Sequence, residues 1–496
     1  MIDTKALRQK ILDMAIKGKL VPQDPNDEPA SVLLEHIRAE KQQLIKEGKI
    51  KKDKNDSVIF KGADNRYYEN LPCGWSVSTL SQVTSSQLLN DGDWILSENM
   101  DPNGNVKLIQ LGSIGLMRYI DKGFKYLTED TFHKLSCTQI FPGYMLINRI
   151  ISDKMYACIL PQLEGKLITT VDTCWIAPKD EWYNLKYLMY FISSTVFQSI
   201  VLHVSSGTTR KRISKSDLIH LPIYLPPLSE QQRIISRVDE LFEQIDIIEK
   251  NKADIDALYD EFRKRTLTLA IQGKLVPQDP NDEPASVLIE RIRAEKKAKL
   301  GKKYVDSYIY KGDDNCYYEH IAGREQDELV EVPFDIPDNW AWSRIDGVAF
   351  LQSGKPFEEL ESGTPYVKVS DMNLSENNIE ITTSQHYCKA TSRDIIPASS
   401  IIFPKRGGAI STNKKRKVLS FYCCIDLNTM CMTPFLSQML EYLFSWFLTI
   451  DLGMMHDGTS VPQINNVDIY PLLVPIPPLA DQKRIVAKIN EIFTML

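Results

Sequence analysis

One sixteen-residue phrase occurs twice in this chain. GKLVPQDPNDEPASVL occupies residues 18–33 and returns unchanged at residues 273–288. A repeat constrains the fold strongly, because each copy is expected to build the same local structure. The phrase is acidic and broken by prolines, which is typical of a loop, and loops usually diverge. A fold for this chain therefore has to need the same joint in two places, and we refer to both copies as the joint.

The repetition extends well beyond the joint. Between the matching tryptophans, Trp75 and Trp340, and the matching PPL letters, the two halves share little beyond a coarse pattern. Each half therefore has repeated flanks around a variable middle. Four further pairs of segments match in the same order: 33–41 with 288–296, 57–70 with 307–320, 71–80 with 336–345, and 225–242 with 476–493.

The repeated flanks are predicted to be helices. After Pro226 and Pro227, Ser229 is a candidate N-cap and Glu230 places a negative charge in the first turn. No Pro or Gly follows until Gly273, so the helix spans about 43 residues, or about 65 Å at 1.5 Å per residue. Its apolar residues form a narrow stripe, which indicates a partner helix. They are Val238, Leu241, Ile245, Ile248, Ile255, Tyr259, Phe262 and Leu269.

The two ends of the chain supply candidates for that partner. The C-terminal helix (480–496) stops at the residue that matches Ile245, and the N-terminal helix (4–17) begins at the residue that matches Tyr259. Together they form a second copy of the central helix that lacks only the equivalent of about 246–258. This predicts a circular pseudo-twofold arrangement, against the alternative of two unrelated helical linkers.

The joint is predicted to start as an extended loop and to enter a short helix capped by Asp27 or Ser31. Lysine-rich runs follow at 46–55 and 296–303. A solvated linker is the plainer interpretation of these runs, and contact with a DNA backbone is the alternative.

Composition places the chain among globular proteins, with 43% hydrophobic and 25% charged residues. No apolar window is long enough to predict a transmembrane helix. The nine cysteines form no CxxC pair, which favours buried free thiols in a reducing cytoplasm. The net charge of −6 argues against indiscriminate coating of nucleic acid, but it permits a DNA reader with local basic clusters.

The variable middles are predicted to be mixed α/β domains of one fold. Their order is the same: three short strands, a helix, and a Gly-Thr loop at 205–213 or 457–464. In the first middle the strands are expected at 106–112, 143–150 and 166–177, with a helix at 185–198. In the second they are expected at 365–372, 399–410 and 421–432, with a helix at 438–449.

Basic and amide side chains gather at matching places in the two middles. In the second, PKRGGAISTNKKRK (404–417) surrounds a Gly-Gly turn, where a backbone can approach a ligand closely. Arg and Asn can fork onto base edges or phosphates, although such clusters are often only solvated faces. The candidate DNA contacts are Asn148, Arg149, Lys154, Thr208, Thr209, Arg210, Lys211, Arg212, Lys368, Lys405, Arg406, Asn413, Lys414, Lys415, Arg416, Thr459, Ser460 and Gln463.

Motifs for catalysis and metal binding are missing from the sequence. There is no GxxxxGK[ST] loop, no GxSxG elbow and no Asp/Asn-Pro-Pro-aromatic tetrapeptide. The seven histidines lack zinc-ligand spacing, so no metal site is expected. These observations favour a non-catalytic DNA reader over a methyltransferase or nuclease. They leave open a scaffold or transcription regulator without a bipartite target.

The repeated elements PPLSEQQRI and PPLADQKRI, the segments LPCGW and IPDNW, and the GTT and GTS loops resemble the DNA specificity subunit of a type I restriction–modification system. The resemblance covers essentially the whole chain. It implies an α+β fold in which two mixed α/β target recognition domains are separated by long helices that form an antiparallel coiled coil with circular pseudo-twofold symmetry. The implied segments are 1–70 (N-terminal helix and joint), 71–225 (first recognition domain), 226–335 (central helix and joint), 336–476 (second recognition domain) and 477–496 (C-terminal helix).

The same resemblance implies the function and the partners. Each recognition domain would read one half of a bipartite, asymmetric target in double-stranded DNA. The helices would dock two methyltransferase subunits, and two restriction subunits would join them. S-adenosylmethionine, ATP and Mg²⁺ would be bound by those partners and not by this chain. The expected docking residues on the central helix are Val238, Leu241, Ile245, Ile248, Ile255 and Phe262. One departure is that Val461, Pro462 and Gln463 replace the basic Arg210, Lys211 and Arg212, so Gln463 is expected to contact a base instead of a phosphate.

Overall fold

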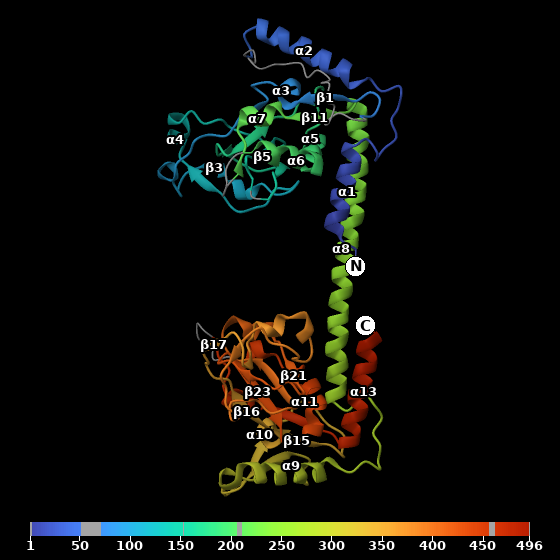
Figure 1. Ribbon diagram of the computed structural model, residues 1–496, viewed down its shortest axis with the longest axis vertical. Coiled ribbons are helices and arrows are strands. Elements are labelled where there is room, and N and C mark those ends of the chain that lie inside the picture. Colours follow the sequence, from blue (N-terminus) through green and yellow to red (C-terminus); the bar gives the residue numbers. More distant parts are fainter. Residues whose placement is uncertain (1, 51–70, 152, 206–210, 456–461, 496) are drawn as a thin grey trace. The chain divides into compact units, whose positions relative to one another are not determined.

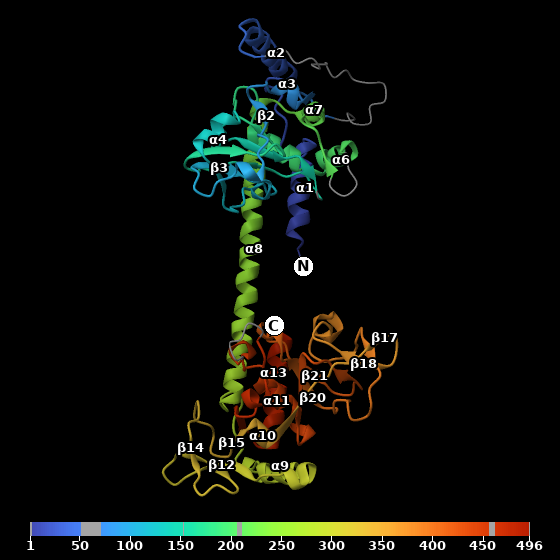
Figure 2. The ribbon, with the colours of Figure 1, turned by 90° about the vertical axis from the view of Figure 1, so that its left-hand side faces the viewer.

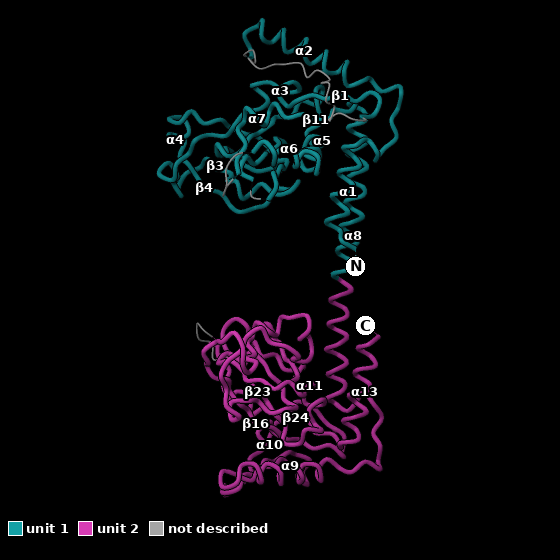
Figure 3. The backbone as a smooth tube through the Cα atoms, in the orientation of Figure 1, with its two compact units in different colours: residues 1–253 teal, residues 254–496 magenta. Residues whose placement is uncertain are grey.

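The computed structural model describes residues 2–50, 71–151, 153–205, 211–455 and 462–495. The chain divides into two compact units, residues 1–253 and 254–496 (Figure 3). Helix α8 (Leu228–Ile271) has 44 residues and contributes to both units. Among the described residues, no single helix is long and apolar enough to cross a membrane, although the bent pair Leu185–Ser193 and Thr195–Val204 passes together by length and composition.

The first unit encloses its variable middle between two paired strands. β1 (Ser76–Thr79) pairs antiparallel with β11 (Pro222–Leu225), so the two ends of the middle lie side by side (Figure 1). The sheet β2-β9-β5-β7 contains Leu89–Asp91, Thr173–Ile176, Met145–Asn148 and Ala157–Ile159, and the sheet β4-β3-β8 contains Lys125–Leu127, Val106–Ile109 and Lys166–Thr169. The helices are α1 (Thr4–Ile16), α2 (Ala30–Lys46), α3 (Leu80–Val83), α4 (Glu129–Lys134), α5 (Leu185–Ser193), α6 (Thr195–Val204) and α7 (Lys215–His220).

The second unit repeats this plan. β15 (Ala341–Arg344) pairs antiparallel with β24 (Leu473–Ile476) and closes the second middle in the same way. The sheet β16-β23-β20-β21 contains Ala349–Ser353, Thr429–Pro434, Ser400–Pro404 and Arg416–Val418, and the sheet β17-β19-β18-β22 contains Glu359–Leu360, Tyr387–Cys388, Thr364–Val367 and Cys424–Ile425. A third sheet, β12-β13-β14, contains Ser307–Lys311, Tyr317–Ile321 and Glu328–Val330. The helices are α9 (Ala285–Leu300), α10 (Ile345–Val348), α11 (Leu440–Phe447), α12 (Asn466–Ile469) and α13 (Leu479–Met495).

In each unit a terminal helix packs antiparallel against α8 (Figures 1 and 2). In the first unit, Arg8 of α1 pairs with Asp246 at 2.6 Å and with Glu249 at 3.1 Å. Asp27, which comes later in the chain, instead pairs with Arg233 near the start of α8. This reversed order of contacts confirms the predicted antiparallel pairing of helices.

The same reversal occurs in the second unit. Arg484, near the start of α13, pairs with Asp282 of the joint that follows α8. Phe493, near the end of α13, lies under the guanidinium of Arg263 on α8 at 5.8 Å. Ile485 is fully buried in a core cluster that includes Leu267 of α8. The two units therefore use one arrangement of helices, as the repeat predicts.

Each joint is fastened to the start of the long helix that packs beside it, α8 in the first unit and α13 in the second, by side chains of the same chemistry. In the first unit, the carboxylate of Glu230 accepts hydrogen bonds from Trp75 Nε1 at 2.9 Å and from Gln23 Nε2 at 3.0 Å. Arg233 forks onto Asp27 at 2.6 and 3.2 Å. We call these five residues, with their counterparts in the second unit, the joint cluster.

In the second unit the joint cluster consists of Gln278, Asp282, Trp340, Asp481 and Arg484. Trp340 Nε1 donates to both Asp481 Oδ2 and Gln278 Oε1 at 3.0 Å, and Arg484 pairs with Asp282 and Asp481. Aspartate is one methylene shorter than glutamate, and here the indole links the carboxylate to the glutamine. Asp481 is fully buried, and this burial raises the pKa of its carboxyl despite the hydrogen bond from Trp340.

Two cap predictions for this region are wrong. Helix α8 begins at Leu228, so Ser229 lies inside it and its hydroxyl donates to Asp27 Oδ1 at 2.5 Å. Helix α2 begins after Pro29 without a side-chain cap. Asp27 is not a cap because its carboxylate is held by Arg233, whose hydrogen bond lowers the pKa of Asp27.

The glycine at the start of each joint cannot be replaced by a residue with a side chain without distorting the structure. Gly18 has φ +64° and Gly273 has φ +70°, which is the left-handed region that follows many helices. A Cβ would lie 2.2 Å from Pro72 Cγ at Gly18 and 2.5 Å from Pro337 Cγ at Gly273. Both the backbone angle and the close approach of a proline therefore require glycine.

Candidate nucleic-acid interface

The two candidate clusters are built on the same backbone ladder. In the first unit, β6 (Ile150–Ile151) pairs antiparallel with β10 (Lys211–Arg212), and the Ile213 amide donates to the Arg149 carbonyl at 3.1 Å. The segment that follows β5 therefore lies beside the last residues of the Gly-Thr loop (205–213).

The second unit repeats this ladder after β20. Arg406 forms an antiparallel bridge with Gln463, and the Gly407 amide donates to the Pro462 carbonyl at 2.7 Å. The Ile464 amide donates to the Lys405 carbonyl at 2.9 Å. Matching these bonds to those of the first unit aligns Arg406 with Ile150, Gln463 with Arg212, and Pro462 with Lys211. One frame thus carries different side chains in the two units.

Arg406 is the most accessible basic side chain on the second ladder. Its Nε and Nη2 donate to Gln463 Oε1 at 3.1 and 2.7 Å, which holds the guanidinium against the amide. Gln463 is itself oriented by a 2.7 Å bond from its Nε2 to Asn465 Oδ1. A Cβ at Gly407 or Gly408 would meet no atom of the described residues within 4 Å, so this part of the chain leaves the adjacent turn open. Within the described chain, Arg406 makes no hydrogen bond through Nη1.

Four of the predicted DNA contacts are occupied inside the protein, and we remove them from the candidate set. Asn148 and Arg149 are each 5% exposed. Arg149 donates to the Val171 carbonyl, and its Nε lies 3.4 Å from Asp91. Lys415 is 2% exposed, and Arg416 donates to the carbonyls of Asn377, Met372 and Lys415. These side chains donate hydrogen bonds to backbone carbonyls of the loops that would otherwise have no partner.

Lys415 and Asn413 shape the turn after the Gly-Gly pair. Asn413 adopts the left-handed conformation, φ 53° and ψ 28°, which asparagine tolerates well. Its Oδ1 accepts from Lys415 Nζ at 2.9 Å and from the Leu452 amide at 3.1 Å. Lys414 donates to Asn373 Oδ1, and Lys405 donates to Ser353 at 2.9 Å. These side chains position the loop, while Arg406 and Gln463 lie at its open side.

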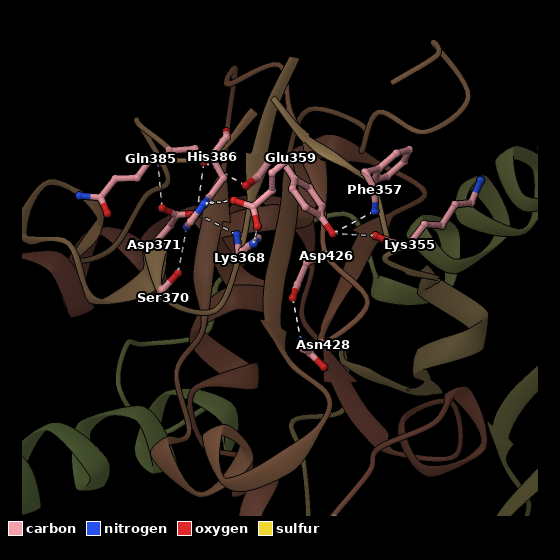
Figure 4. A network of polar contacts seen from close by, with 12 residues as sticks. Lys355, Phe357, Glu359, Lys368, Ser370, Asp371, Gln385, His386, Asp426 and Asn428 are labelled. Carbon is pink, nitrogen blue, oxygen red and sulfur yellow. Dashed lines mark hydrogen bonds and ion pairs between the residues drawn. The ribbon is translucent and has the colours of Figure 1, made fainter. Parts of the chain in front are cut away.

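Lys368 belongs to a separate polar network (Figure 4). Its ammonium pairs with Glu359, whose other oxygen lies 2.8 Å from His386 Nδ1. The Lys368 amide donates to Asp371 Oδ2 at 2.8 Å, and the Gln385 amide donates to Asp371 Oδ1 at 3.0 Å. The hydrogen bond from Lys368 lowers the pKa of Glu359, so the positive charge of Lys368 is largely neutralised at this face.

The remaining candidates of the first unit are only partly described. Arg212 is exposed and pairs with Asp172 at 2.9 Å, and Lys211 lies beside it on β10. Lys154 is half-buried, and its Nζ lies 3.5 Å from Gln9 Oε1. Five candidates lie outside the described residues: Thr208, Thr209, Arg210, Thr459 and Ser460.

The predicted docking residues of α8 separate into two groups. Val238 and Ile245 are buried in the core of the first unit, and Leu241 packs against that core. These three residues are therefore packed inside the chain and are not available to dock a partner. Ile248, Ile255 and Phe262 are 40%, 48% and 48% exposed. The heptad pattern missed two neighbours that are more exposed still: Ile247 at 56% and Leu258 at 63%. Counting a and d positions finds the apolar face, but it does not show which part of that face the terminal helices cover.

Comparison with known proteins identifies the family. The profile described as the type I restriction modification DNA specificity domain matches residues 72–257 and 337–494. The chain belongs to this family. The type I restriction enzyme EcoAI specificity subunit of Escherichia coli is 28% identical, over 98% of this chain and 88% of the relative. The EcoEI specificity subunit of Escherichia coli is 29% identical, over 69% of this chain and 61% of the relative.

A solved structure supports the fold of this specificity protein. It is described as the structural basis underlying complex assembly and conformational transition of the type I R-M system. One of its chains superposes with a TM-score of 0.53 at 18% identity, covering 86% of this chain and 91% of the other. The family is one of DNA specificity, and the relatives are named specificity subunits. The role of this specificity protein is therefore recognition of a DNA sequence and not catalysis.

The specificity protein keeps most of its thiols buried. Seven of the nine cysteines are buried, and Cys73 and Cys316 are exposed. Burial raises the pKa of Cys158 to about 12, so this thiol is unreactive. In the part of the chain that the structure describes, no group of three or more His, Cys, Asp or Glu side chains could hold a metal ion.

Lys415 gives the specificity protein a characteristic dependence of stability on pH. Burial lowers the pKa of Lys415 from its ordinary 10.5 to about 7. Between these values the unfolded lysine holds a proton that the folded one has lost, so stability rises with pH by up to about 1.4 kcal/mol per unit. We expect Lys415→Met to remove this rise in denaturant unfolding between pH 7.5 and 9.5. Lys414→Met, the control, should retain it, and an equal slope in the wild type and Lys415→Met would contradict the assignment.

Proposed function

We propose that the chain reads a bipartite, asymmetric target in double-stranded DNA, with one half-site for each recognition domain. The observation that carries this proposal is the shared ladder with exchanged side chains. Lys211 and Arg212 of the first unit stand where Pro462 and Gln463 stand in the second, and Ile150 stands where Arg406 stands. Equal frames that present different hydrogen-bonding groups are suited to different base sequences.

The pair Arg406–Gln463 has the chemistry of a base reader. A guanidinium can donate two parallel hydrogen bonds to guanine O6 and N7, and a glutamine amide can do the same to adenine N6 and N7. Because Gln463 already holds the guanidinium, little conformational entropy is lost on binding. Arg212 and Lys211, without an amide at this position, are better suited to the phosphate backbone of the other half-site.

Replacing Arg406 by alanine is expected to relax the sequence preference in one half-site only. The loss of a bidentate contact costs about 1–3 kcal/mol, or about 5- to 150-fold in affinity for the preferred sequence. The measurement is selection from a randomised duplex library with the assembled complex, followed by titration of the selected sites. Arg393→Ala, an exposed arginine of the same unit, is the control. An equal loss for all sequences would instead make Arg406 a phosphate contact.

We also propose that methyltransferase subunits dock on the uncovered part of α8 and that restriction subunits join them in the cytoplasm. In the second unit, Ile255, Leu258, Tyr259 and Phe262 share the spacing i, i+3, i+4, i+7 and are 39–63% exposed. A continuous exposed apolar face of this kind usually marks a protein interface. S-adenosylmethionine, ATP and Mg²⁺ would be held by the partners.

A charged side chain on this face is expected to block assembly. Leu258→Glu with Phe262→Glu buries two carboxylates in any apolar interface, which should weaken the complex with the methyltransferase subunit by at least about 100-fold. Light scattering on a size-exclusion column and titration calorimetry measure it. The control is Val467→Glu, which alters a 75% exposed valine on α12. Unchanged assembly of the double variant would exclude this face as the docking site.

A further inference from the structure

The sheet β12-β13-β14, whose strands β12 and β14 are labelled in Figure 2, has one aromatic face that the proposed function does not use. Its strands pair so that Tyr308 lies opposite His320 and Tyr310 lies opposite Tyr318. Since side chains alternate between the two faces of a sheet, these four rings share one face. Neighbouring ring centroids are 5.1–6.0 Å apart. Tyr310 is 40% exposed, and Leu329, which lies opposite Tyr318 on β14, is 62% exposed. We call this surface the tyrosine face.

The sheet is a fixed platform and not a loose arm. On its opposite face, Ile309 and Val330 are buried in a cluster with Trp342 of β15. Glu319, which also lies on that face, accepts a 2.7 Å hydrogen bond from Arg344 Nε. The tyrosine face therefore keeps its shape without a partner, which lowers the entropic cost of binding one.

The surroundings of the tyrosine face are strongly acidic. Residues 304–338 contain ten Asp or Glu residues against one Lys and one Arg. Tyr310 donates to Asp327 at 2.8 Å, and Tyr318 donates to Asp314 at 2.6 Å. These hydrogen bonds lower the pKa of Asp327 and of Asp314, so both carboxylates remain ionised at neutral pH. Phosphate groups are repelled by such a surface, which excludes it from the DNA interface.

One arginine of the chain shows how a guanidinium binds a tyrosine ring and a carboxylate of this sheet region together. Arg293 of α9 lies 4.5 Å above the Tyr308 ring and forks onto Asp306, which also accepts from Tyr304. Tyr310 with Asp327, and Tyr318 with Asp314, repeat this combination of a ring and a carboxylate. Asp327 also lies 2.9 Å from His320 Nδ1, but among the described residues no Lys or Arg lies within ion-pair distance of Asp327 or Asp314.

We propose that the tyrosine face is a docking surface for a basic segment of another protein, recognised by arginine side chains that stack on Tyr310 and Tyr318 and pair with Asp327 and Asp314. Charge complementarity selects a cationic partner. The planar guanidinium can stack on a ring and fork onto a carboxylate together, which an ammonium cannot do, so arginine is preferred to lysine.

The test uses the full chain and two labelled heptapeptides, in which glycine alternates with arginine or with lysine. Fluorescence anisotropy should show saturable binding, tighter for the arginine peptide. The double variant Tyr310→Ala, Tyr318→Ala should bind it about tenfold more weakly, as expected for the loss of two exposed cation–π contacts. Asp314→Asn with Asp327→Asn should also weaken binding and reduce its dependence on salt. This second pair changes little volume, so it gives a result even if the alanine variant unfolds.

A matched control tests whether charge alone explains the binding. Glu358→Gln with Glu361→Gln removes two exposed carboxylates elsewhere in the second unit and should leave the affinity unchanged. Equal loss in this control, or equal affinity in the wild type and the tyrosine variant, would overturn the proposal. Weaker binding of a random-sequence DNA duplex to the tyrosine variant than to the wild type would also overturn the proposal, because the tyrosine face would then contact nucleic acid. Protection of the two DNA half-sites is expected to be the same in all these variants, so this test and the test of the DNA-reading proposal can fail separately.

Discussion

Trp340→Ala is expected to destabilise the second unit by about 3–5 kcal/mol, as for other large core side chains. Trp340 is 6% exposed and packs in a cluster with Leu267, Ile485 and Ile489. Its ring also meets Tyr442 edge to face at 6.5 Å. The substitution removes this packing and leaves a cavity between α8, α13 and the recognition domain.

The indole nitrogen of Trp340 adds a second contribution that can be separated from packing. It donates to Asp481, which is fully buried, and to Gln278. Trp340→Phe keeps most of the volume but leaves a buried carboxylate short of a donor, at a cost of about 1–3 kcal/mol. Calorimetric and denaturant unfolding measure both variants. Trp94→Ala, which alters a 67% exposed tryptophan, is the control. A loss below about 1 kcal/mol for Trp340→Ala would show that the joint cluster does not hold the helices.

Exchange of residues 71–225 for the corresponding middle of the EcoAI specificity subunit is expected to replace one half-site and to preserve the other. Affinity for the original target should fall by about 10³-fold or more, because the specific contacts of one domain are lost together. These boundaries keep β1 and β11 on the same transplanted piece, so their antiparallel pairing closes the new domain as it closed the old one. Selection from a randomised library reports both half-sites in one experiment.

The converse exchange of residues 336–476 controls for a general loss of binding. It preserves the pair β15 and β24 in the same way and should alter the other half-site. If either exchange changed both halves of the target, the recognition domains would not be independent readers.

Much of the fold could be predicted from the sequence, because the two halves of the chain can be aligned with each other. The copies of the joint, the tryptophans and the PPL segments fix the order of the elements in both halves, and the apolar stripe on α8 indicates a partner helix. The reason for the repeat was less accessible. Gln23, Asp27, Trp75, Glu230 and Arg233 are far apart in sequence, and their contacts appear only in the structure. A usable signal was present, since all five have a counterpart of the same chemistry in the second half.

The candidate DNA contacts were harder to predict, because the sequence does not show whether a basic side chain faces solvent or binds the backbone of its own chain. Arg416 lies on β21 and satisfies three carbonyls of its own chain, whereas Arg406, ten residues earlier, is exposed. Strand alternation and the left-handed turn at Asn413 decide this difference. Composition carries neither property, so the run PKRGGAISTNKKRK does not show which of its basic side chains are exposed.

Footprinting of the chain, assembled with its methyltransferase subunits, on its own DNA target tests the central claim most directly. The target is first identified by sequencing the methylated sites of a host with and without the gene. Two protected patches are predicted, separated by a spacer in which every base can be changed without loss of affinity, and Arg406→Ala should weaken base discrimination in one patch alone. A single continuous patch, or a spacer whose sequence matters as much as the patches, would contradict the claim that the chain carries two independent readers.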